Sequence, residues 1–430
     1  MRLRLPASST MRGVIAISSG TLVGQLIVAA ATPILSRIYE PEAFGVHSTI
    51  LAIASAIGPA AALKFDSAIM LPRRDADARG LLILSLMSTG AVAVVAGLAA
   101  MLFGPMAFSE AWSTVPLAPL WVFALVTATG VFTSLVQATL RGKSYGAVGW
   151  RAAVQSTATT AAQLGLGLLS PTPASLLGGT VIGRGLGFFA FGRALRPLVR
   201  STGGATFRVL VRSYWRSPLL LAPSSLLNAF GSQMPLVVVA AVFGAASAGQ
   251  LGMAQRLVFL PAAILGAALA QVFGAEVAQR LRDGAGSSRR LYLAATLRIS
   301  LVAVPVAVII IIAAPWAMPW LLGNEWAVSG PLAQAMALTA SLGLIVSPLS
   351  QVYLVHQSAA SLFVDGSRIM LVGGATVWIV AGSFDVVAGV WMLSLAQFAN
   401  YVITWVYGLR IVSRTVTDEA ADNDVPSPRL

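Results

Sequence analysis

Residues 64–103 read KFDSAIMLPRRDADARGLLILSLMSTGAVAVVAGLAAMLF, and they contain the pattern from which the fold follows. A short segment with four basic residues precedes 24 residues, 80–103, that carry no charge. An α-helix crosses the hydrocarbon core of a bilayer with about 20 predominantly apolar residues. Uncharged segments of this kind recur along the chain, so the chain is predicted to cross a membrane many times.

The composition supports this prediction. The chain has 430 residues, of which 57% are hydrophobic and only 10% are charged, whereas soluble domains carry about 25% charged residues. The excess apolar side chains must therefore face lipid. We expect an all-α polytopic membrane protein with about twelve transmembrane helices. The predicted segments are 14–36, 44–63, 80–103, 117–138, 152–169, 175–192, 219–243, 249–273, 299–322, 329–352, 369–382 and 386–409.

The basic residues predict the orientation in the membrane. Of the 28 Lys and Arg residues, 25 lie in alternate gaps between these segments, and Arg37 alone lies in one of the other gaps. Because cytoplasmic loops carry an excess of Lys and Arg, both termini are predicted to be cytoplasmic. The net charge of +13 is therefore interpreted as an orientation signal and not as a nucleic-acid surface.

The longest gap, 193–218, divides the predicted helices six and six. Weak internal similarity supports a duplication, since Phe44–Gly45 corresponds to Ala248–Gly249. Duplicated halves place the substrate site at their interface, near the middle of the membrane. We therefore expect two six-helix bundles around a central cavity. The predicted parts are an N-terminal bundle 1–192, a basic cytoplasmic linker 193–218, a C-terminal bundle 219–410 and a disordered cytoplasmic tail 411–430.

The sequence contains no recognisable catalytic or metal site. There is no cysteine, and the two histidines, His47 and His356, are predicted on opposite sides of the membrane. No phosphate-binding Gly-x-x-x-x-Gly-Lys-Ser/Thr motif occurs. The predicted outer loops are too short for a membrane glycosyltransferase or polymerase. A transporter without a catalytic residue, a metal or another cofactor is therefore expected.

Two arginines, Arg184 and Arg256, lie inside predicted membrane segments. A central arginine costs about 2.5–3.5 kcal/mol on insertion scales. Each is either an anion-binding group, because a guanidinium matches phosphate geometry, or a structural or snorkelling side chain. Amide side chains in the segments are either further substrate contacts or interhelical hydrogen bonds. The amide candidates for substrate binding are Gln25, Asn228, Gln233, Gln271 and Gln351.

Lys64 and Asp66 follow the second predicted segment on the inner side. They are candidates for a cytoplasmic gate, and the alternative is an interfacial ion pair.

Three groups of motifs carry a family resemblance. They are LSRIYEPEAFG at 35–45 with KFDSAIMLP at 64–72, YWRSP at 214–218 with 222–228 and AQR at 254–256, and LGNEW at 322–326 with VSPLSQV at 346–352. In this order and spacing they resemble the polysaccharide transporter or O-antigen flippase family. That family belongs to the superfamily that also contains multidrug antiporters and lipid-linked oligosaccharide exporters. The family would lead us to expect Glu at the position of Asp66.

The resemblance implies that the protein flips oligosaccharides linked to undecaprenyl pyrophosphate across the bacterial inner membrane by alternating access. The product would serve O-antigen (lipopolysaccharide), capsule or exopolysaccharide synthesis, beside a polysaccharide polymerase. Arg256, with Arg184, would neutralise the pyrophosphate, and the amides would bind sugar hydroxyls. Coupling to H⁺ or Na⁺ stays open. The alternative is a small-molecule or drug-cation antiporter, although no Asp or Glu falls in the twelve predicted segments.

Overall fold

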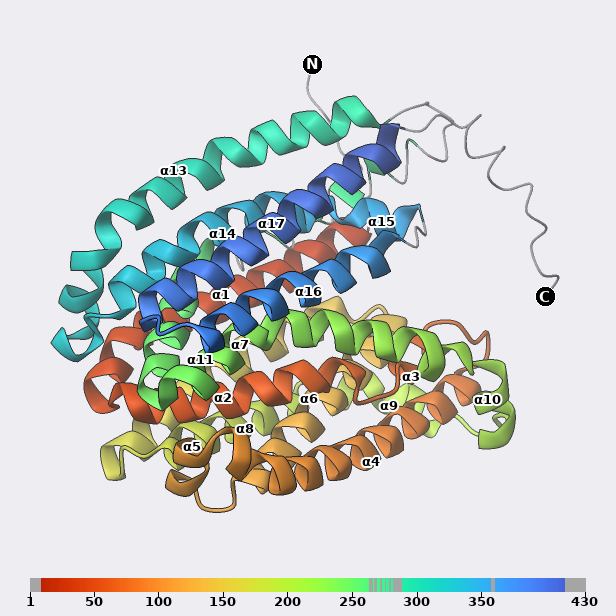
Figure 1. The fold of residues 1–430 in the computed structure, drawn as a ribbon. Coiled ribbons are helices and arrows are strands. Elements are labelled where there is room, and N and C mark those ends of the chain that lie inside the picture. Colours follow the sequence, from red (N-terminus) through yellow and green to blue (C-terminus); the bar gives the residue numbers. More distant parts are fainter. Residues whose placement is uncertain are drawn as a thin grey trace. The chain divides into compact units, whose positions relative to one another are not determined.

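Helices form every regular element in the part of the chain that the computed structural model describes. The described residues are 9–413 without 263–265, 267–268, 271–272, 275, 278–279, 281–287 and 357–359. The predicted tail 411–430 therefore lies almost entirely outside the described residues. The chain forms two compact units (Figure 1): Met1–Leu257 with Trp316–Gly330, and Val258–Pro315 with Pro331–Leu430.

The first unit contains most of the helices. They are α1 (Ser9–Ile38), α2 (Pro41–Ile57), η1 (Gly58–Ala60), α3 (Phe65–Ala68), α4 (Asp75–Ala107), α5 (Ser109–Thr114), α6 (Ala118–Arg141), α7 (Tyr145–Leu169), α8 (Pro173–Phe189), α9 (Gly192–Arg200), α10 (Phe207–Ser213), η2 (Ser217–Leu221), α11 (Ala222–Val258) and η3 (Asn324–Trp326). The pairs α7–α8, α1–α7 and α4–α6 pack most extensively, and Figure 1 shows α4 and α6 side by side.

Two apolar clusters hold this unit together. One is centred on α2 and α6, where Val46, Ile50, Val122 and Leu125 are fully buried. The other lies at the end that carries α3, α9 and α10, and it contains the following residues: Phe65, Ile69, Leu81, Phe191, Leu195 and Leu198. Much of the remaining apolar surface is exposed, as expected of helices that face lipid.

The second unit is built from α13 (Arg289–Leu322), α14 (Ser329–Leu349), α15 (Gln351–Val355), α16 (Ala360–Ala381) and α17 (Val386–Ser413), with the ends of α13 and α14 nearest η3 assigned to the first unit. Polar side chains join these helices through backbone carbonyls. Tyr292 Oη donates to the carbonyl of Trp405 (3.0 Å), and Thr339 Oγ1 donates to the carbonyl of Ser394 (2.9 Å). Such bonds satisfy polar groups where lipid offers no partner.

The membrane-spanning fold is confirmed. Among the described residues, nine helices are long and apolar enough to cross a membrane, and the bent pair α8–α9 makes a tenth candidate. Two further predicted segments account for the difference from twelve. The residues of the seventh segment and the start of the eighth share α11, which is broken at Gly244 (φ 84°, ψ 175°). The fifth forms α7, whose many Gln, Ser and Thr residues lower its hydropathy.

The eleventh predicted segment begins too late. The sequence placed it at 369–382, but α16 begins at Ala360, so Asp365 and Arg368 lie within the helix. Asp365 is buried, and Arg368 Nε donates to Asn400 Oδ1 (3.3 Å). The prediction that no acidic residue falls in a membrane segment is therefore wrong for this helix. The boundary was missed because a charged pair at a helix end resembles the start of a loop.

The predicted linker 193–218 contains two short helices, α9 and α10. The helix axis bends by 59° between α8 and α9. Asp77 accepts a hydrogen bond from the backbone N–H of Ala205 (2.7 Å), and Arg79 donates to the carbonyl of Ser201 (2.7 Å). The linker is therefore attached to the start of α4. The division into two six-helix bundles stays a prediction.

Candidate functional site

The site begins where α2 crosses α11 at close range. A Cβ atom added to Gly45 would overlap the carbonyl oxygen of Ala245, and one added to Gly249 would overlap the carbonyl oxygen of Pro41. Only glycine allows backbones to approach this closely. Gly45 and Gly249 are the two glycines that the internal similarity pairs, and here they lie against each other.

Beside this crossing lies a cavity of about 310 Å³. We call it the cationic cavity, because its lining includes Arg256 and no acidic side chain. Polar groups from both helices face it. Its lining consists of Phe44, His47, Ser48, Leu51, Ala52 and Ser55 from α2 and Gln233, Leu236, Gly252, Gln255 and Arg256 from α11.

Arg256 has an unsatisfied hydrogen-bond donor in this cavity. Its Nη1 atom is buried and has no hydrogen-bond partner among the described residues. The guanidinium carbon lies 5.8 Å from the ring centroid of Phe44, at a distance where the aromatic face attracts a cation. The Phe44 ring packs edge-on against Trp326, 5.5 Å between centroids. Since a buried unpaired charge is costly, an anionic ligand would stabilise this arrangement.

His47 is 4% exposed and is held by a chain of hydrogen bonds. Its Nε2 lies 3.1 Å from Thr180 Oγ1, which also accepts from Gln163 Nε2 (3.2 Å). Thr180 donates its single hydroxyl proton to the carbonyl of Leu176 (2.9 Å). Thr180 must therefore accept from His47, which assigns the proton of the neutral ring to Nε2. The buried Nδ1 has no partner among the described residues and is free to accept a hydrogen bond.

Arg184 lies near the cavity but has protein partners. Its Nη1 donates to the carbonyl of Leu125 (3.1 Å) and to Thr129 Oγ1 (2.6 Å), both on α6. The charges of Arg256 and Arg184 both act on His47. Arg184 thus contributes to a positive region while its head group is tied to α6, and a role for it in anion binding stays a prediction.

Arg151 extends this positive region along α7. The sequence placed it in an inner gap, but it is 8% exposed within the helix. Its guanidinium lies 3.5 Å above the Phe132 ring and bonds Gln155, and it interacts electrostatically with Arg184. In the described part of the chain, no ion pair neutralises Arg151, Arg184 or Arg256.

The structure brings together only part of the predicted amide set. Gln233 lines the cationic cavity. Gln25 is half-buried on α1 and Asn228 is exposed on α11, and neither is a lining residue. Gln351 lies in α15 of the second unit, next to Gly274. Gln271 lies outside the described residues.

Sequence reasoning missed four polar lining residues: His47, Ser48, Ser55 and Gln255. A signal was present, because Phe44, His47 or Ser48, Leu51 and Ser55 recur at three- to four-residue spacing and so share one face of α2. His47 was set aside because a single histidine forms no metal site. Among the described residues, no group of three His, Cys, Asp or Glu side chains could hold a metal.

Lys64 and Asp66, the predicted cytoplasmic gate, flank a tight turn. Leu63 and Lys64 both have positive φ (48° and 59°). Asp66 is 3% exposed, and its Oδ1 has no partner among the residues described. Burial raises the pKa of Asp66, while the positive charge of Lys64 acts in the opposite direction. The gate stays a prediction.

Solved structures of membrane transporters share this fold. The lipid II flippase MurJ, in an inward closed conformation, aligns with a TM-score of 0.66 at 14% identity and covers 94% of this chain and 90% of its own. A MOP superfamily transporter from Pyrococcus furiosus aligns with a TM-score of 0.61 at 13% identity, over 93% and 95%. An outward-facing multidrug resistance MATE family transporter aligns with a TM-score of 0.55 at 14% identity, over 93% and 95%.

No curated protein sequence matches the chain significantly. A family model described as polysaccharide biosynthesis protein matches residues 34–331. This match covers the cationic cavity and more than half of the chain. The chain therefore belongs to the polysaccharide biosynthesis protein family and has the fold of the MOP superfamily transporters.

Proposed function

We propose that this protein moves an oligosaccharide linked to undecaprenyl pyrophosphate across the bacterial inner membrane, by alternating access. The observation that carries the proposal is the buried, unpartnered Nη1 of Arg256 in a cavity lined by no acidic residue. A buried guanidinium without a counter-ion favours an anionic ligand, and its planar donor fork suits phosphate oxygens.

The other lining groups suit a phosphorylated sugar. Gln233 and Gln255 carry both donors and acceptors, and Ser48 and Ser55 offer hydroxyls. His47 Nδ1 has no partner among the described residues and can accept a hydrogen bond from a sugar hydroxyl. The membrane potential assists export, because each charge that crosses it contributes about 2.3 kcal/mol per 100 mV. An anion leaving an inside-negative cell moves in the favourable direction.

Membership of the polysaccharide biosynthesis protein family supports this substrate class. The fold is shared with the lipid II flippase MurJ, which is consistent with a lipid-linked glycan. We further propose that the polymerase which extends the glycan receives it on the outer side. Coupling to H⁺ or Na⁺ would supply additional driving force.

A drug-cation antiporter is the second candidate, because MATE family transporters share the fold. Such a protein needs an acidic group facing its substrate, whereas the cationic cavity repels organic cations. The buried carboxylates that the structure does contain, Asp66 and Asp365, are not among its lining residues. The charge of the cavity therefore favours the lipid-linked anion.

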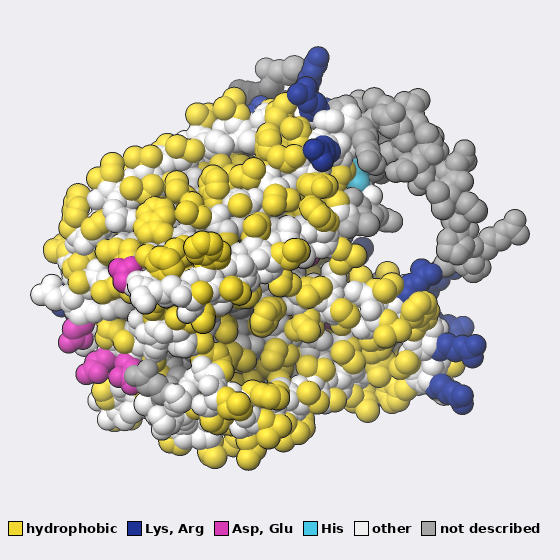
Figure 2. Space-filling view, in the orientation of Figure 1, with side chains coloured by type: hydrophobic (Ala, Val, Ile, Leu, Met, Phe, Trp, Pro, Cys, Tyr) yellow, Lys and Arg dark blue, Asp and Glu magenta, His cyan; other side chains and the backbone are white. Residues whose placement is uncertain are grey.

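The orientation proposed from the basic residues places both termini in the cytoplasm. In Figure 2, the visible Lys and Arg side chains of the first unit gather at the end that carries α9 and α10. This end would face the anionic inner leaflet. A substrate made at the cytoplasmic surface would enter from this side.

Replacement of Arg256 tests the proposal. In a strain that lacks the chromosomal gene and any redundant flippase, Arg256→Ala should reduce surface polysaccharide at least about tenfold, because one charge-assisted hydrogen bond contributes about 1.5–3 kcal/mol. Lipid-linked repeat units should accumulate on the inner leaflet. Arg256→Lys should retain part of the export, since the charge stays while the planar fork is lost.

Arg37→Ala is the matched control, because Arg37 is exposed at the end of α1 and is not a lining residue. It should export normally at equal protein level. Full export by Arg256→Ala at normal protein level would rule out the anion-binding role. Normal surface polysaccharide in the deletion strain, or a gain of resistance to cationic drugs on expression, would instead favour the antiporter.

A further inference from the structure

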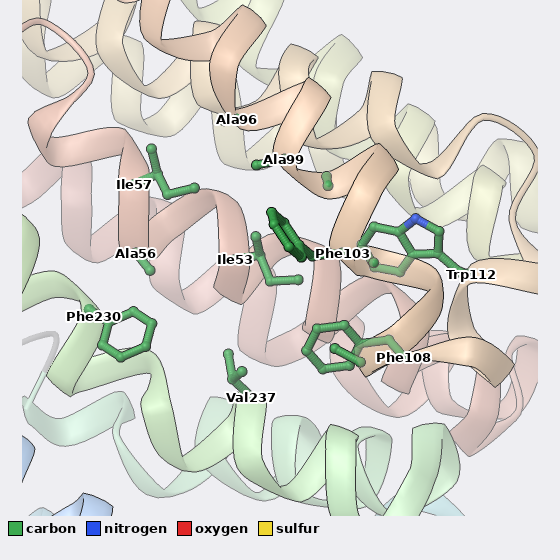
Figure 3. A pocket seen from close by; sticks show the side chains of 13 residues that line it. Ile53, Ala56, Ile57, Ala96, Ala99, Phe103, Phe108, Trp112, Phe230 and Val237 are labelled. Atoms are coloured by element: carbon green, nitrogen blue, oxygen red, sulfur yellow. The ribbon is translucent and has the colours of Figure 1, made fainter.

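A second pocket lies in the first unit, with a chemistry opposite to that of the cationic cavity. Its volume is about 260 Å³, and α2, α4, α5 and α11 form its walls. Its lining includes Ile53, Ala56, Ala100, Phe103, Trp112 and Phe230. Figure 3 shows Phe103 between Ile53 and Trp112, while Phe230 and Val237 approach from α11. All the lining side chains are aliphatic or aromatic, and we call this the apolar pocket.

The two pockets share the same pair of helices. On α2, Ser55 lines the cationic cavity and the next residue, Ala56, lines the apolar pocket. On α11, Gln233 lines the former, and Phe230, three residues earlier, lines the latter. Three residues correspond to about 4.5 Å along a helix. The pockets are therefore neighbours along the α2–α11 pair: their lining residues overlap near Ile53–Ser55 and Gln233–Val237, while Arg256 lies beside Phe44 at the other end of the cationic cavity.

Adjacent polar and apolar pockets fit an amphiphile. We propose that the apolar pocket binds the isoprenoid chain of the carrier lipid whose pyrophosphate binds at Arg256. This inference rests on the function proposed above and adds a chain-binding site to it. The pocket volume of about 260 Å³ leaves room for a short segment of an apolar chain.

A chain that is already dissolved in lipid gains no hydrophobic free energy by entering a protein pocket, because lipid tails are equally apolar. Binding must come from shape and van der Waals contact. The pocket has the composition for this, with a small residue, Ala100, beside the large rings of Phe103, Trp112 and Phe230. A phospholipid also carries a phosphate, but its chains lack the methyl branches of an isoprenoid and its head group has one phosphate where the carrier has two. The carrier lipid therefore uses both pockets more fully than a phospholipid does.

The test measures equilibrium binding to the purified full-length protein in detergent micelles of fixed composition. The ligands are inorganic pyrophosphate, farnesyl pyrophosphate, undecaprenyl pyrophosphate and phosphatidylglycerol. In the wild type, affinity should rise at least tenfold from inorganic pyrophosphate to the prenyl compounds. Ala100→Phe, which fills the pocket, should remove most of this gain in affinity and leave the affinity for inorganic pyrophosphate unchanged.

Two further variants keep the result interpretable. Phe103→Ala widens the pocket. Because the Phe103 side chain is 65% exposed, the variant should fold normally, and its affinity for the prenyl compounds should fall several-fold. Ala91→Phe adds the same ring at an exposed position of α4 that is not a lining residue, and it should bind every ligand like the wild type.

The outcomes separate the two proposals. One outcome is that Arg256→Ala weakens the binding of all three pyrophosphate ligands, while Ala100→Phe and Phe103→Ala leave the higher affinity for prenyl compounds unchanged. In that case the apolar pocket does not bind the chain, and the proposed function stands. If Arg256→Ala leaves pyrophosphate binding unchanged, the proposed function fails and this inference fails with it. If phosphatidylglycerol competes as well as undecaprenyl pyrophosphate and responds to the same pocket variants, the pocket is a general acyl-chain site and the isoprenoid assignment is overturned.

Discussion

Asp66 is a buried carboxyl group whose ionised form is poorly solvated. Because burial raises its pKa in the folded protein, the folded state binds a proton more tightly than the unfolded state. Its contribution to stability is therefore present below the unfolded pKa of about 3.9 and is lost as the pH rises through the raised folded value. At a pH above both pKa values, the ionised side chain lowers the stability of the fold.

Asp66→Asn removes this ionisable group from its buried position. We expect the substitution to raise the thermal unfolding midpoint at pH 8 by about 2–4 °C, the shift that about 1 kcal/mol produces, and to have a smaller effect at pH 5. The measurement is thermal unfolding of the purified protein across this pH range. Asp75→Asn is the control. Asp75 is exposed and pairs with Arg141 (2.9 Å), so its loss should cost at most about 1 kcal/mol. A lower midpoint for Asp66→Asn at pH 8 would contradict the prediction.

At the scale of the helices, the crossing of α2 and α11 controls the shape of the site. The glycine pair at this crossing lets the two backbones touch, and the cationic cavity and the apolar pocket both lie along the same helix pair. Replacing Gly45 by Ala places a methyl group onto the carbonyl oxygen of Ala245. A backbone atom cannot move away by changing rotamer, so the helices must separate.

Gly45→Ala and Gly249→Ala should each destabilise the protein by about 1–3 kcal/mol, the usual cost of overpacking. Gly90→Ala is the matched control, because Gly90 lies within α4 with no atom within 4 Å of an added Cβ. Alanine there should stabilise the helix by about 0.5–1 kcal/mol. Thermal unfolding and the yield of monodisperse protein measure both effects. Equal stability of all three variants would refute the close crossing.

At the scale of the whole molecule, orientation in the membrane is the property that the function requires. The chain contains no cysteine, so single cysteines report topology without a background. Ser109→Cys, at the start of α5, should react with a membrane-impermeant maleimide in intact cells. Thr202→Cys, between α9 and α10, should react only after the membrane is opened. Labelling of Thr202→Cys in intact cells would contradict the orientation that the basic residues predict.

Much of the fold could be predicted from the sequence because lipid imposes a simple rule. Each crossing needs about 20 apolar residues with internal hydrogen bonds, and such segments are visible without any tertiary contact. The family resemblance was also a property of local phrases, and the match over residues 34–331 confirms it. The start of α16 was missed because Asp365 and Arg368 follow a pattern that a loop would also show.

The amino-acid sequence alone established that this chain is a helical membrane protein, where most of its membrane segments lie, and that Arg184 and Arg256 are charged residues inside them. Which polar residues share a cavity followed from helix packing, because in lipid the outside of a helix is as apolar as its packed face. His47 therefore looked isolated in the sequence, whereas Thr180 and Gln163, more than 100 residues away, hold it in the fold. Gln25 and Asn228 looked equivalent to Gln233, and helix packing alone separated them.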